Sequence, residues 1–531
     1  MTAAAQRRPL AGFGTLLGFT LRYNWLRLVL WLLVTVGMLG LIGSFYASMA
    51  PVALEQLALG SDAPAMKALI GAISNTDPLG GKVWIKSWMF LALMLGIGMV
   101  FFVTHNRRAD EDSGRTELFR SRPLGLHSSL AATLIIAVGL CVVVGVGCGA
   151  VGVSLGFGDT ATGSLGVLGA WVFGASIAAI GLLGVGIGVL ANELMPSSGA
   201  ANGLGGGLFG LFYLMRLIGD VDLAGLAGLT WVSPVGWAEK MDPWGANRLW
   251  PLALVVGLGA VLVVAGILIE ARRDYGGSLF PVKLGRPYAR GSMTSVWGLA
   301  VRLQRVAWLA WAGSLAALAV FLGAVTDMMG EMMAELGFGV GSTVGYLLSM
   351  LMLGIGAFTV QSTSTMALDD TRGLLERQLA GSLTRLGWVG QRLAVSLVGS
   401  LGLLVATGLV YASAYCVVAD DSSQFWPIVG TVFAYLPSLL VLIGIAALGL
   451  GWWPRLAVTI SWVSFGAIWF SLIIGEVLRL PRATLESLPF ISVAGLPDIA
   501  IPWPKILVTL GVGVVLVVVG LIGFRRRNIP A

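Results

Sequence analysis

Two short polar segments carry the residues of this chain that are best suited to chemistry. Each reads acid-x-x-Gly-x-x-Glu, and the two copies lie 259 residues apart. Such a segment offers two carboxylates and a flexible glycine over a short stretch, an arrangement that can present charged side chains to a partner protein. The residues are Glu111, Gly114 and Glu117 in the first copy and Asp370, Gly373 and Glu376 in the second.

The simplest alternative is a solvated loop whose acids form internal salt bridges. Arg107, Arg108, Arg115 and Arg120 are available for this role near the first copy. One copy alone would favour that interpretation. The recurrence of the pattern in a chain with few charges favours a functional role instead. The part after each glycine would form a short helix along the membrane surface and face a cytoplasmic partner.

Other reactive patterns are missing from the sequence. No Gly-x-x-x-x-Gly-Lys-Ser/Thr phosphate loop occurs, and the nearest fragment, Gly80-Gly81-Lys82, lacks the first glycine. Three cysteines without regular spacing form neither a disulfide framework nor a zinc site, and two histidines lie 22 positions apart. We therefore predict no catalytic residues, no metal site and no cofactor bound by this chain.

The composition places these segments in a membrane protein. Hydrophobic residues make up 57% of the 531 residues and charged residues 11%, against about 45–50% and about 25% in soluble proteins. We predict an all-α polytopic membrane protein with about twelve transmembrane helices, since each span needs about 20 apolar residues. The predicted spans are 27–47, 84–104, 128–156, 165–191, 199–218, 250–270, 306–326, 342–366, 388–417, 426–450, 456–475 and 504–524.

The distribution of basic residues predicts the orientation of the chain. If the N-terminus is cytoplasmic, the inner segments hold 24 Lys and Arg against 10 Asp and Glu, and the outer segments hold 9 against 16. Both termini then lie inside, which requires an even number of spans. Because the basic residues are spread along the inner membrane face, the net charge of +7 does not indicate nucleic-acid binding.

Three sequence matches in the same order indicate a tandem duplication. The polar segments give the most specific match, because charges are scarce in this chain. The others pair residues 257–266 with 511–520 and Phe209-Gly210 with Phe465-Gly466. We predict two six-span halves, residues 1–283 and 284–531, with the same orientation and a pseudo-twofold axis normal to the membrane.

The predicted spans have almost no ionisable residues in their interiors. Glu193, Arg216, Glu270 and Glu476 lie at predicted span ends. An ion-driven carrier would usually need a carboxylate near the midplane. Its absence favours an external energy source and a hydrophobic or amphiphilic cargo. Candidate residues of the cargo path, which as an alternative would only pack or face lipid, are Phe209, Phe212, Tyr213, Tyr346, Met350, Phe465, Trp469 and Phe470.

The first polar segment also resembles a known family. With Leu118 directly after it and Pro123-Leu124 beyond, it resembles the segment that follows the second span of ABC-2 type permeases. The second copy is degenerate, since Ser382 stands at the place of the proline. The amphipathic stretches 16–27 and 297–305 look like the interfacial helix of that family. With two fused halves, the chain resembles the permeases of tetronasin-type antibiotic exporters.

The resemblance implies two type V exporter-like halves in a bacterial plasma membrane. They would move hydrophobic or amphiphilic compounds, such as antibiotics and other drugs, out of the cell. Two copies of a separate ABC ATPase subunit would bind ATP and Mg²⁺, so this chain would be a transport subunit and not an enzyme. Residues 106–127 and 368–387 would be the coupling segments, and the second and fifth spans of each half would line the pathway.

Two other classes of protein remain open at this point. Twelve spans in two halves also fit an ion-coupled secondary transporter. A membrane-embedded lipid-linked glycosyltransferase would need clustered acids on the outer side, where Asp62, Asp77 and the pair Asp420-Asp421 are available. The pair lies in a very short loop beside two serines, where a solvated turn is the simpler interpretation.

Overall fold

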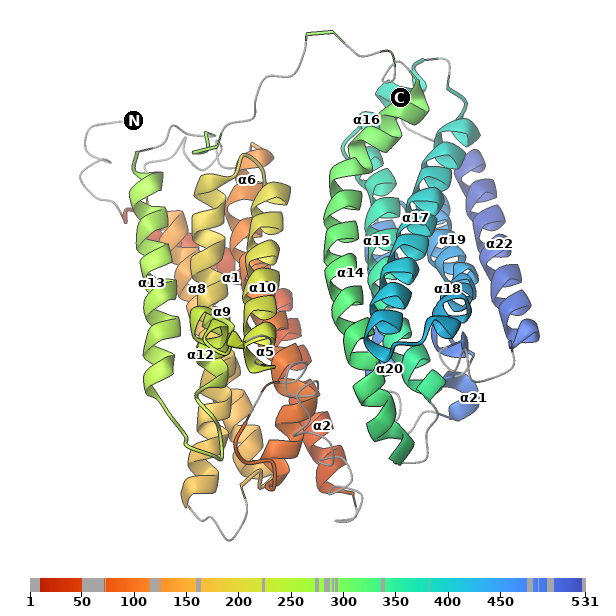
Figure 1. Cartoon of the computed structure of the whole chain (residues 1–531). Helices are drawn as coiled ribbons and strands as arrows, with labels where there is room; N and C mark the ends of the chain where they lie inside the picture. Colours follow the sequence, from red (N-terminus) through yellow and green to blue (C-terminus); the bar gives the residue numbers. More distant parts are fainter. Residues whose placement is uncertain are drawn as a thin grey trace. The chain divides into compact units, whose positions relative to one another are not determined.

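In the computed structural model all long secondary-structure elements are helices, and no strand occurs among the described residues (Figure 1). The chain divides into two compact units, Met1–Leu284 and Gly285–Ala531. The structure describes residues 10–49, 71, 73–114, 124–125, 127–158, 164–221, 225–272, 277–280, 287–288, 291, 295–335, 340–381, 383–474, 481–485, 487–493 and 501–527.

The first unit is built around one buried helix, α9, which packs against α5, α8 and α13. A π-helical turn, η1 (Leu33–Gly37), joins α1 to α2 within a single long helix. The α-helices are α1 (Phe13–Leu32), α2 (Met38–Ala47), α5 (Leu79–Asn106), α6 (Arg108–Asp112), α8 (Ser128–Ser154), α9 (Ser164–Leu194), α10 (Ser198–Asp220), α11 (Leu229–Val232), α12 (Pro234–Glu239) and α13 (Trp250–Glu270).

In the second unit, α15 occupies the centre and contacts α14, α17, α19 and α20. Two 3-10 segments, η4 (Ser422–Gln424) and η5 (Ile491–Val493), lie between longer helices. The α-helices are α14 (Val296–Glu335), α15 (Val340–Thr371), α16 (Leu374–Leu379), α17 (Arg385–Ala419), α18 (Phe425–Phe433), α19 (Leu436–Trp452), α20 (Ala457–Ile474), α21 (Arg482–Leu485) and α22 (Trp503–Arg526).

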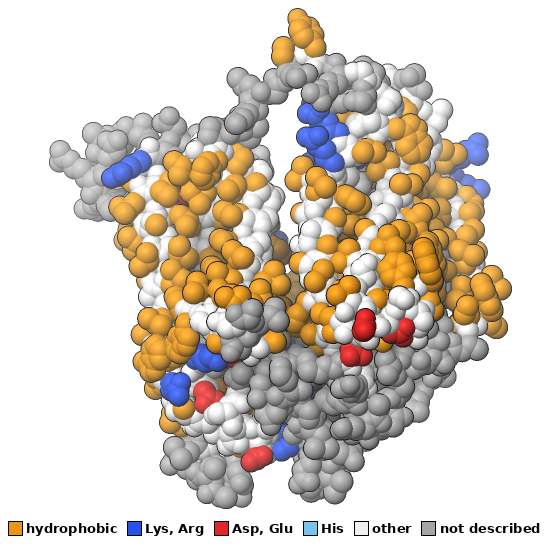
Figure 2. Space-filling model, in the orientation of Figure 1, with side chains coloured by type: hydrophobic (Ala, Val, Ile, Leu, Met, Phe, Trp, Pro, Cys, Tyr) orange, Lys and Arg blue, Asp and Glu red, His pale blue; other side chains and the backbone are white. Residues whose placement is uncertain are grey.

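Ten helical segments of the described chain are long and apolar enough to cross a membrane. In a bilayer each backbone N–H and C=O group needs a partner within the protein, and a helix provides one for every residue. On the face of the second unit visible in Figure 2, hydrophobic side chains cover the middle, with basic side chains toward one end and acidic ones toward the other. The protein is therefore a polytopic α-helical membrane protein.

Two of the twelve predicted spans are not among these ten segments. The prediction at 199–218 corresponds to α10, a glycine-rich helix whose apolar character is lowered further by Arg216 and Asp220. The prediction at 456–475 corresponds to α20, whose apolar part, Ala457–Leu472, is a shorter helix. Both segments are thus helical, as predicted, but their composition and length do not mark them as spans.

The stretches predicted as interfacial helices belong to longer helices. Residues 16–27 lie within α1, and residues 297–305 form the first turns of α14. The 40 residues of α14 would extend about 60 Å at 1.5 Å per residue, about twice the thickness of the hydrocarbon core. This helix is therefore longer than a membrane span requires.

The same glycine contact holds the last long helix in each unit. In the first unit, a Cβ placed on Gly186 of α9 would lie 2.5 Å from the carbonyl oxygen of Gly259 in α13. In the second unit, a Cβ on Gly444 of α19 would lie 3.0 Å from the carbonyl oxygen of Gly513 in α22. Small residues let helix backbones approach this closely. The two contacts correspond to each other, since Gly444 lies 258 residues after Gly186 and Gly513 lies 254 residues after Gly259.

A matched pair of glycines in α22 tests this packing. A Cβ on Gly520 would lie 2.6 Å from both the carbonyl oxygen of Ala447 and the amide nitrogen of Leu448, whereas a Cβ on Gly511 would meet nothing within 4 Å. We expect Gly520→Val to destabilise the solubilised protein by about 1–3 kcal/mol, the usual cost of overpacking. Gly511→Val should leave the thermal unfolding midpoint nearly unchanged, and equal effects of the two changes would contradict the contact.

Candidate functional site

The two polar segments with the acid-x-x-Gly-x-x-Glu pattern are called the first and second motif segments below. The first one, which contains Glu111 and Gly114, follows a break between two helices. Arg107, with φ −125° and ψ −78°, separates α5 from α6. After α6, Gly114 adopts φ 71° and its N–H donates to the carbonyl oxygen of Glu111 at 3.0 Å. The Glu111 carboxylate pairs with Arg108 at 2.8 Å. The predicted residue Glu117 lies outside the described residues.

The second motif segment repeats this turn. Gly373 adopts φ 68°, and its N–H donates to the carbonyl oxygen of Asp370 at 3.0 Å. The Asp370 carboxylate accepts a hydrogen bond from Arg527, just after α22, at 2.6 Å. Glu376 lies on α16, which begins directly after the glycine, and its side chain is exposed.

Both glycines are thus needed for a left-handed backbone conformation that other residues adopt only with strain. The first acid of each motif is held by an arginine of its own unit. Arg108 is one of the arginines that the salt-bridge alternative named for the first copy, whereas that alternative named no partner for Asp370. The arginines differ, since Arg108 is three residues from Glu111 whereas Arg527 is 157 residues from Asp370. Among the described motif acids, Glu376 is the one whose side chain is exposed.

A buried charge cluster lies beside the first motif segment. Arg107 contacts Glu193, at the end of α9, at 3.2 Å and Glu270, at the end of α13, at 2.7 Å. His127, just before α8, lies 3.2 Å from the other carboxylate oxygen of Glu270. The side chains of the arginine and the two glutamates are each at most 7% exposed. The cluster ties the ends of α5, α9 and α13 and the start of α8 together.

The sequence analysis placed Glu193 and Glu270 at span ends but missed their shared partner. The sequence signal for this partner is the position of the two acids, because an isolated acid at the end of an apolar helix needs a nearby cation. Arg108 is buried as well, and it donates to the carbonyl oxygens of Pro196 at 2.8 Å and Gly277 at 3.0 Å. The two arginines after α5 therefore hold the motif segment to the body of the first unit.

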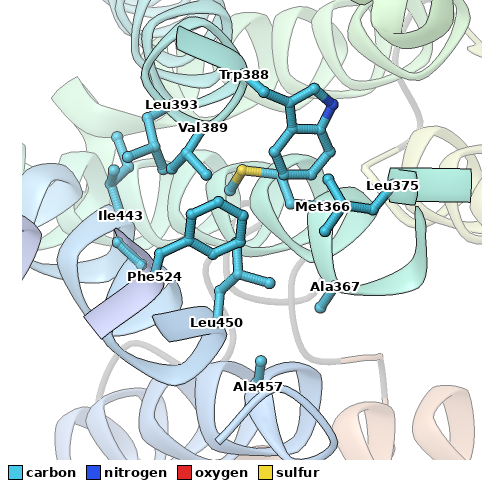
Figure 3. Close-up of a cluster of buried hydrophobic side chains, with 11 residues drawn as sticks. Met366, Ala367, Leu375, Trp388, Val389, Leu393, Ile443, Leu450, Ala457 and Phe524 are labelled. Carbon is cyan, nitrogen blue, oxygen red and sulfur yellow. The ribbon is translucent and has the colours of Figure 1, made fainter. Parts of the chain in front are cut away.

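The corresponding place in the second unit is apolar. At the spacings that relate the sequence matches, Met366 stands for Arg107 and Phe524 stands for Glu270. Both are buried in a hydrophobic cluster with Trp388, whose ring stacks on that of Phe524 at 6.0 Å between centroids. Figure 3 shows these side chains converging from α15, α17, α19 and α22, with Leu375 of α16 beside them.

A second buried charge cluster lies at the C-terminal end of α10. Arg216 contacts Glu239 at 2.5 Å and Asp220 at 2.6 Å, and all three side chains are fully buried. Lys240 lies within 3.9 Å of both acids. The sequence analysis placed Arg216 at a span end but gave Asp220, Glu239 and Lys240 no role. The cluster fastens α10 to the short helix α12.

A cavity of about 590 Å³ lies in the first unit. Nine of its eleven lining residues come from α5, between Ile85 and Phe101, and the others are Trp31 and Tyr213. Trp31 packs directly over Gly98, where a Cβ would overlap its indole ring. Lys86 is the one charged residue among the eleven. Cavities of this size, mostly apolar with a few polar groups, are typical of sites for small molecules.

Of the predicted cargo-path residues in the first unit, Tyr213 lines this cavity. Phe209 is buried instead, with its ring packed against Gly96 of α5. Phe212 is half-buried, and its carbonyl oxygen accepts a hydrogen bond from Ser233 at 2.6 Å. One turn of α10 therefore contributes both a cavity residue and packing residues.

The predicted residues of the second unit lie on two helices. Tyr346 and Met350 are exposed on α15, which is otherwise mostly buried. Phe465, Trp469 and Phe470 are half-buried on α20. The Phe465 ring lies 3.1 Å from where a Cβ on Gly356 would be, so it packs on α15.

The acid pair considered for an enzyme forms a turn. Asp420 caps α17 with φ 50°, and the Asp421 carboxylate accepts a hydrogen bond from the backbone N–H of Ser423 at 2.8 Å. Hydrogen bonds from Ser423 lower the pKa of Asp421. The described residues contain no group of three His, Cys, Asp or Glu side chains that could hold a metal ion. The pair therefore has the geometry of a solvated helix cap.

The fold and site together describe a multi-pass membrane protein with an apolar cavity beside its second long helix. A family model described as multidrug efflux system permease Rv1217c, C-terminal domain, matches residues 293–525. The chain is also 29% identical to the multidrug efflux system permease protein Rv1217c of Mycobacterium tuberculosis (strain ATCC 25618 / H37Rv). That similarity extends over 564 aligned residues and covers 99% of this chain and 98% of the relative.

The charge cluster beside the first motif segment can be tested by comparing one and three substitutions. Arg107→Met leaves Glu193 and Glu270 buried without their shared cation, which typically costs about 3–5 kcal/mol. We expect a clearly lower thermal unfolding midpoint for the solubilised variant. Arg107→Met combined with Glu193→Gln and Glu270→Gln should recover part of the loss, because no unpaired charge then remains. A triple variant as unstable as the single one would contradict this electrostatic account.

Proposed function

We propose that this chain is the membrane subunit of an ATP-driven exporter of hydrophobic or amphiphilic compounds. The observation that carries the proposal is the similarity to a multidrug efflux permease over 99% of the chain. Within the described residues, ten apolar helices are long enough to cross a membrane, and they support the proposal because they provide the body of a permease.

The cavity beside α5 is the proposed place of the cargo. Its volume of about 590 Å³ falls within the range of about 300–1,000 Å³ common for drug-sized ligands. Phe90, Met94 and Phe101 give it the apolar surface that a hydrophobic compound needs. In the second unit, Tyr346 and Met350 are exposed on α15 and remain candidates for contact with cargo.

Energy would come from partner chains, because this sequence contains no phosphate loop. In the proposal, two ABC ATPase subunits bind ATP and Mg²⁺ and contact the two motif segments. Contacts within each unit would transmit the movement of the ATPase subunits from the motif segments to the long helices. Asp370 links the end of α15 to Arg527 after α22, and Arg107 links the end of α5 to α9 and α13. A push on either segment would therefore move several long helices together.

The proposed location is the plasma membrane of a bacterium, with both termini in the cytoplasm. Described arginines lie at the end of α22 and on the exposed side of α16, as the positive-inside rule requires for that orientation. The buried acids Glu193, Asp220 and Glu239 sit at helix ends with arginine partners. This placement gives them structural roles and favours ATP over an ion gradient as the energy source.

The proposal is tested with the chain and its cognate ABC ATPase in proteoliposomes. Efflux of a hydrophobic dye should require ATP and should stop when the catalytic glutamate of the ATPase is replaced by glutamine. An ionophore that collapses proton and sodium gradients should leave efflux unchanged. Efflux that persists without ATP and stops with the ionophore would instead establish an ion-coupled transporter.

The exposed acid of the second motif segment gives a sharper test of coupling. We expect Glu376→Arg to lower both ATPase association and efflux at least about tenfold, because a like charge facing a basic partner surface costs several kcal/mol. Asp421→Arg is the matched control, since Asp421 follows the opposite end of α17 and should change neither quantity. If Glu376→Arg supports association and efflux like the parent chain, the coupling role of this segment is wrong.

A further inference from the structure

The first long helix of the first unit contains a π turn directly after the cavity residue Trp31. Residues Leu33–Gly37 form this turn, η1, between α1 and α2. A π turn closes its hydrogen bonds over one residue more than an α-helix does, and such turns bend helices and often occur at functional sites. The hydroxyl of the buried Thr35 donates to the carbonyl oxygen of Trp31 at 2.6 Å. The backbone at Trp31 is therefore held by a side chain of the π turn.

The helix is packed differently on the two sides of this turn. Five of the ten residues of α2 are buried, and a Cβ on Gly43 would lie 2.8 Å from the side chain of Leu155. By contrast, Asn24 is the one buried residue among the 20 of α1. The part after the turn is thus fixed in the first unit, while the part before it has few buried side chains to displace.

Two residues of α1 face α5 from the same side. Asn24 and Trp31 are seven residues apart, which is close to two turns of helix and about 10 Å along it. Asn24 donates to Oδ1 of Asn106 at 2.7 Å, and both side chains are buried. Trp31 packs over Gly98, where a Cβ would overlap its indole ring. The helix α1 thus meets α5 at these two points.

The asparagine pair joins α1 to the start of the first motif segment. Asn106 is the last residue of α5 and directly precedes Arg107, which belongs to the buried charge cluster. The amide nitrogen of Asn106 donates to the carbonyl oxygen of Phe102 at 2.8 Å, and Arg27 donates to Oδ1 of Asn24 at 2.8 Å. Hydrogen bonds on both helices thus fix the pair, because a buried polar group is costly when it is unbonded. A displacement of Asn106 would therefore be transmitted to α1.

The first helix of the second unit is built differently. It is α14, which is α-helical over its whole length and contains no π turn. The indole groups of Trp308 and Trp311 donate hydrogen bonds to the carbonyl oxygen of Gly399 at 2.9 Å and to Oε1 of Gln361 at 2.6 Å. Among the residues that the structure describes, no such hydrogen bond holds the indole of Trp31. Trp31 is therefore kept in place by packing, which a rotation of α1 would undo.

We propose that Trp31 is a movable wall of the cavity and that the first motif segment controls its position through Asn24 and Asn106. Displacement of that segment would move α1, and η1 would absorb the rotation. A change from π to α bonding in this turn would rotate α1 relative to α2 by about 100°, the rotation per residue of an α-helix. The indole would then leave Gly98 and widen the cavity beside α5. The role in cargo transport rests on the proposed export function, whereas the movement itself can be measured on the chain alone.

The test measures how strongly Trp31 quenches a bimane label in the full chain, held in phosphatidylcholine nanodiscs. The label is attached to Phe101→Cys, which lines the cavity one turn along α5 from Gly98, in a chain whose three natural cysteines are replaced by alanine. Tryptophan quenches bimane at short range, and the part of the quenching that Trp31→Phe removes reports the indole over Gly98. We expect such quenching in the parent chain. Gly98→Ala should remove it, because the added methyl group occupies the place of the indole.

The asparagine pair gives the decisive variant. Asn24→Leu combined with Asn106→Leu removes the link without leaving either asparagine buried and unpaired. We expect the ratio of the two indole positions to shift about fivefold toward the open one, or about 1 kcal/mol, which is typical of one hydrogen bond. Thr15→Leu, which replaces an exposed polar side chain of the same helix, is the matched control and should leave the quenching unchanged.

Two substitutions at Thr35 test the π turn. Thr35→Val removes the hydroxyl that holds the carbonyl oxygen of Trp31, and we expect it to lower the quenching. Thr35→Ser keeps that hydroxyl and should retain the quenching of the parent chain. The comparison separates the hydrogen bond from a general loss of packing, because valine preserves the side-chain volume better than serine does.

Three results would overturn the proposal. They are unchanged quenching in the double asparagine variant, unchanged quenching in Gly98→Ala, and equal effects of Thr35→Val and Thr35→Ser. Because the measurement needs neither ATP nor a partner, a failed efflux experiment would reject the exporter and leave the movement of Trp31 intact. Efflux that persists while the quenching responds to none of these changes would reject the movable wall alone.

Discussion

In a bilayer a charged side chain has no water to solvate it, and this cost determines where the charges of the described chain lie. The first unit buries two ion clusters, one around Arg107 and one around Arg216, at different ends of its long helices. Each pairs an arginine with two acids from other turns or helices. Elsewhere in this unit helices meet through close glycine contacts, such as Gly186 against Gly259, which need no polar side chain.

The two units share a close glycine contact between helices but differ in the contacts beside their motif segments. Gly186 against Gly259 and Gly444 against Gly513 bring the same pair of helices together in each unit. Beside the motif segments, however, the buried ion cluster of Arg107 in the first unit corresponds to the apolar cluster of Met366, Trp388 and Phe524 in the second. The second unit keeps ion pairs next to that cluster, between Asp370 and Arg527 and between Asp369 and Arg392. The two proposed coupling segments would therefore be joined to their units by different combinations of ionic and apolar contacts.

The cavity links this architecture to transport. Its long wall is α5, the helix whose other end enters the Arg107 cluster and the first motif segment. A movement of that segment would be carried along a stiff helix to the residues that line the cavity. The arrangement offers a direct mechanical connection between a proposed partner surface and a proposed cargo site within one unit.

Parts of the candidate site were predictable because they depend on local sequence. The sequence predicted a flexible glycine followed by a short helix, and in the second copy α16 does begin directly after Gly373. Both Gly114 and Gly373 adopt the left-handed conformation that only glycine enters easily. The pairing of Asp370 with Arg527 was not predictable, because 157 residues separate them. The aromatic pattern of α10 also did not reveal that Tyr213 lines a cavity while Phe209 is buried.

The sequence by itself determined the class of the protein, an all-helical chain that crosses a membrane many times, because the hydrophobic effect and backbone hydrogen bonding act on every apolar segment alike. It also located the two motif segments, since charges are conspicuous where they are rare. Only the tertiary structure decided that Arg107 is shared by two distant glutamates and that Lys86 is the one charge in an otherwise apolar cavity lining. Both properties depend on which faces of separate helices meet, and helix periodicity alone does not specify that choice.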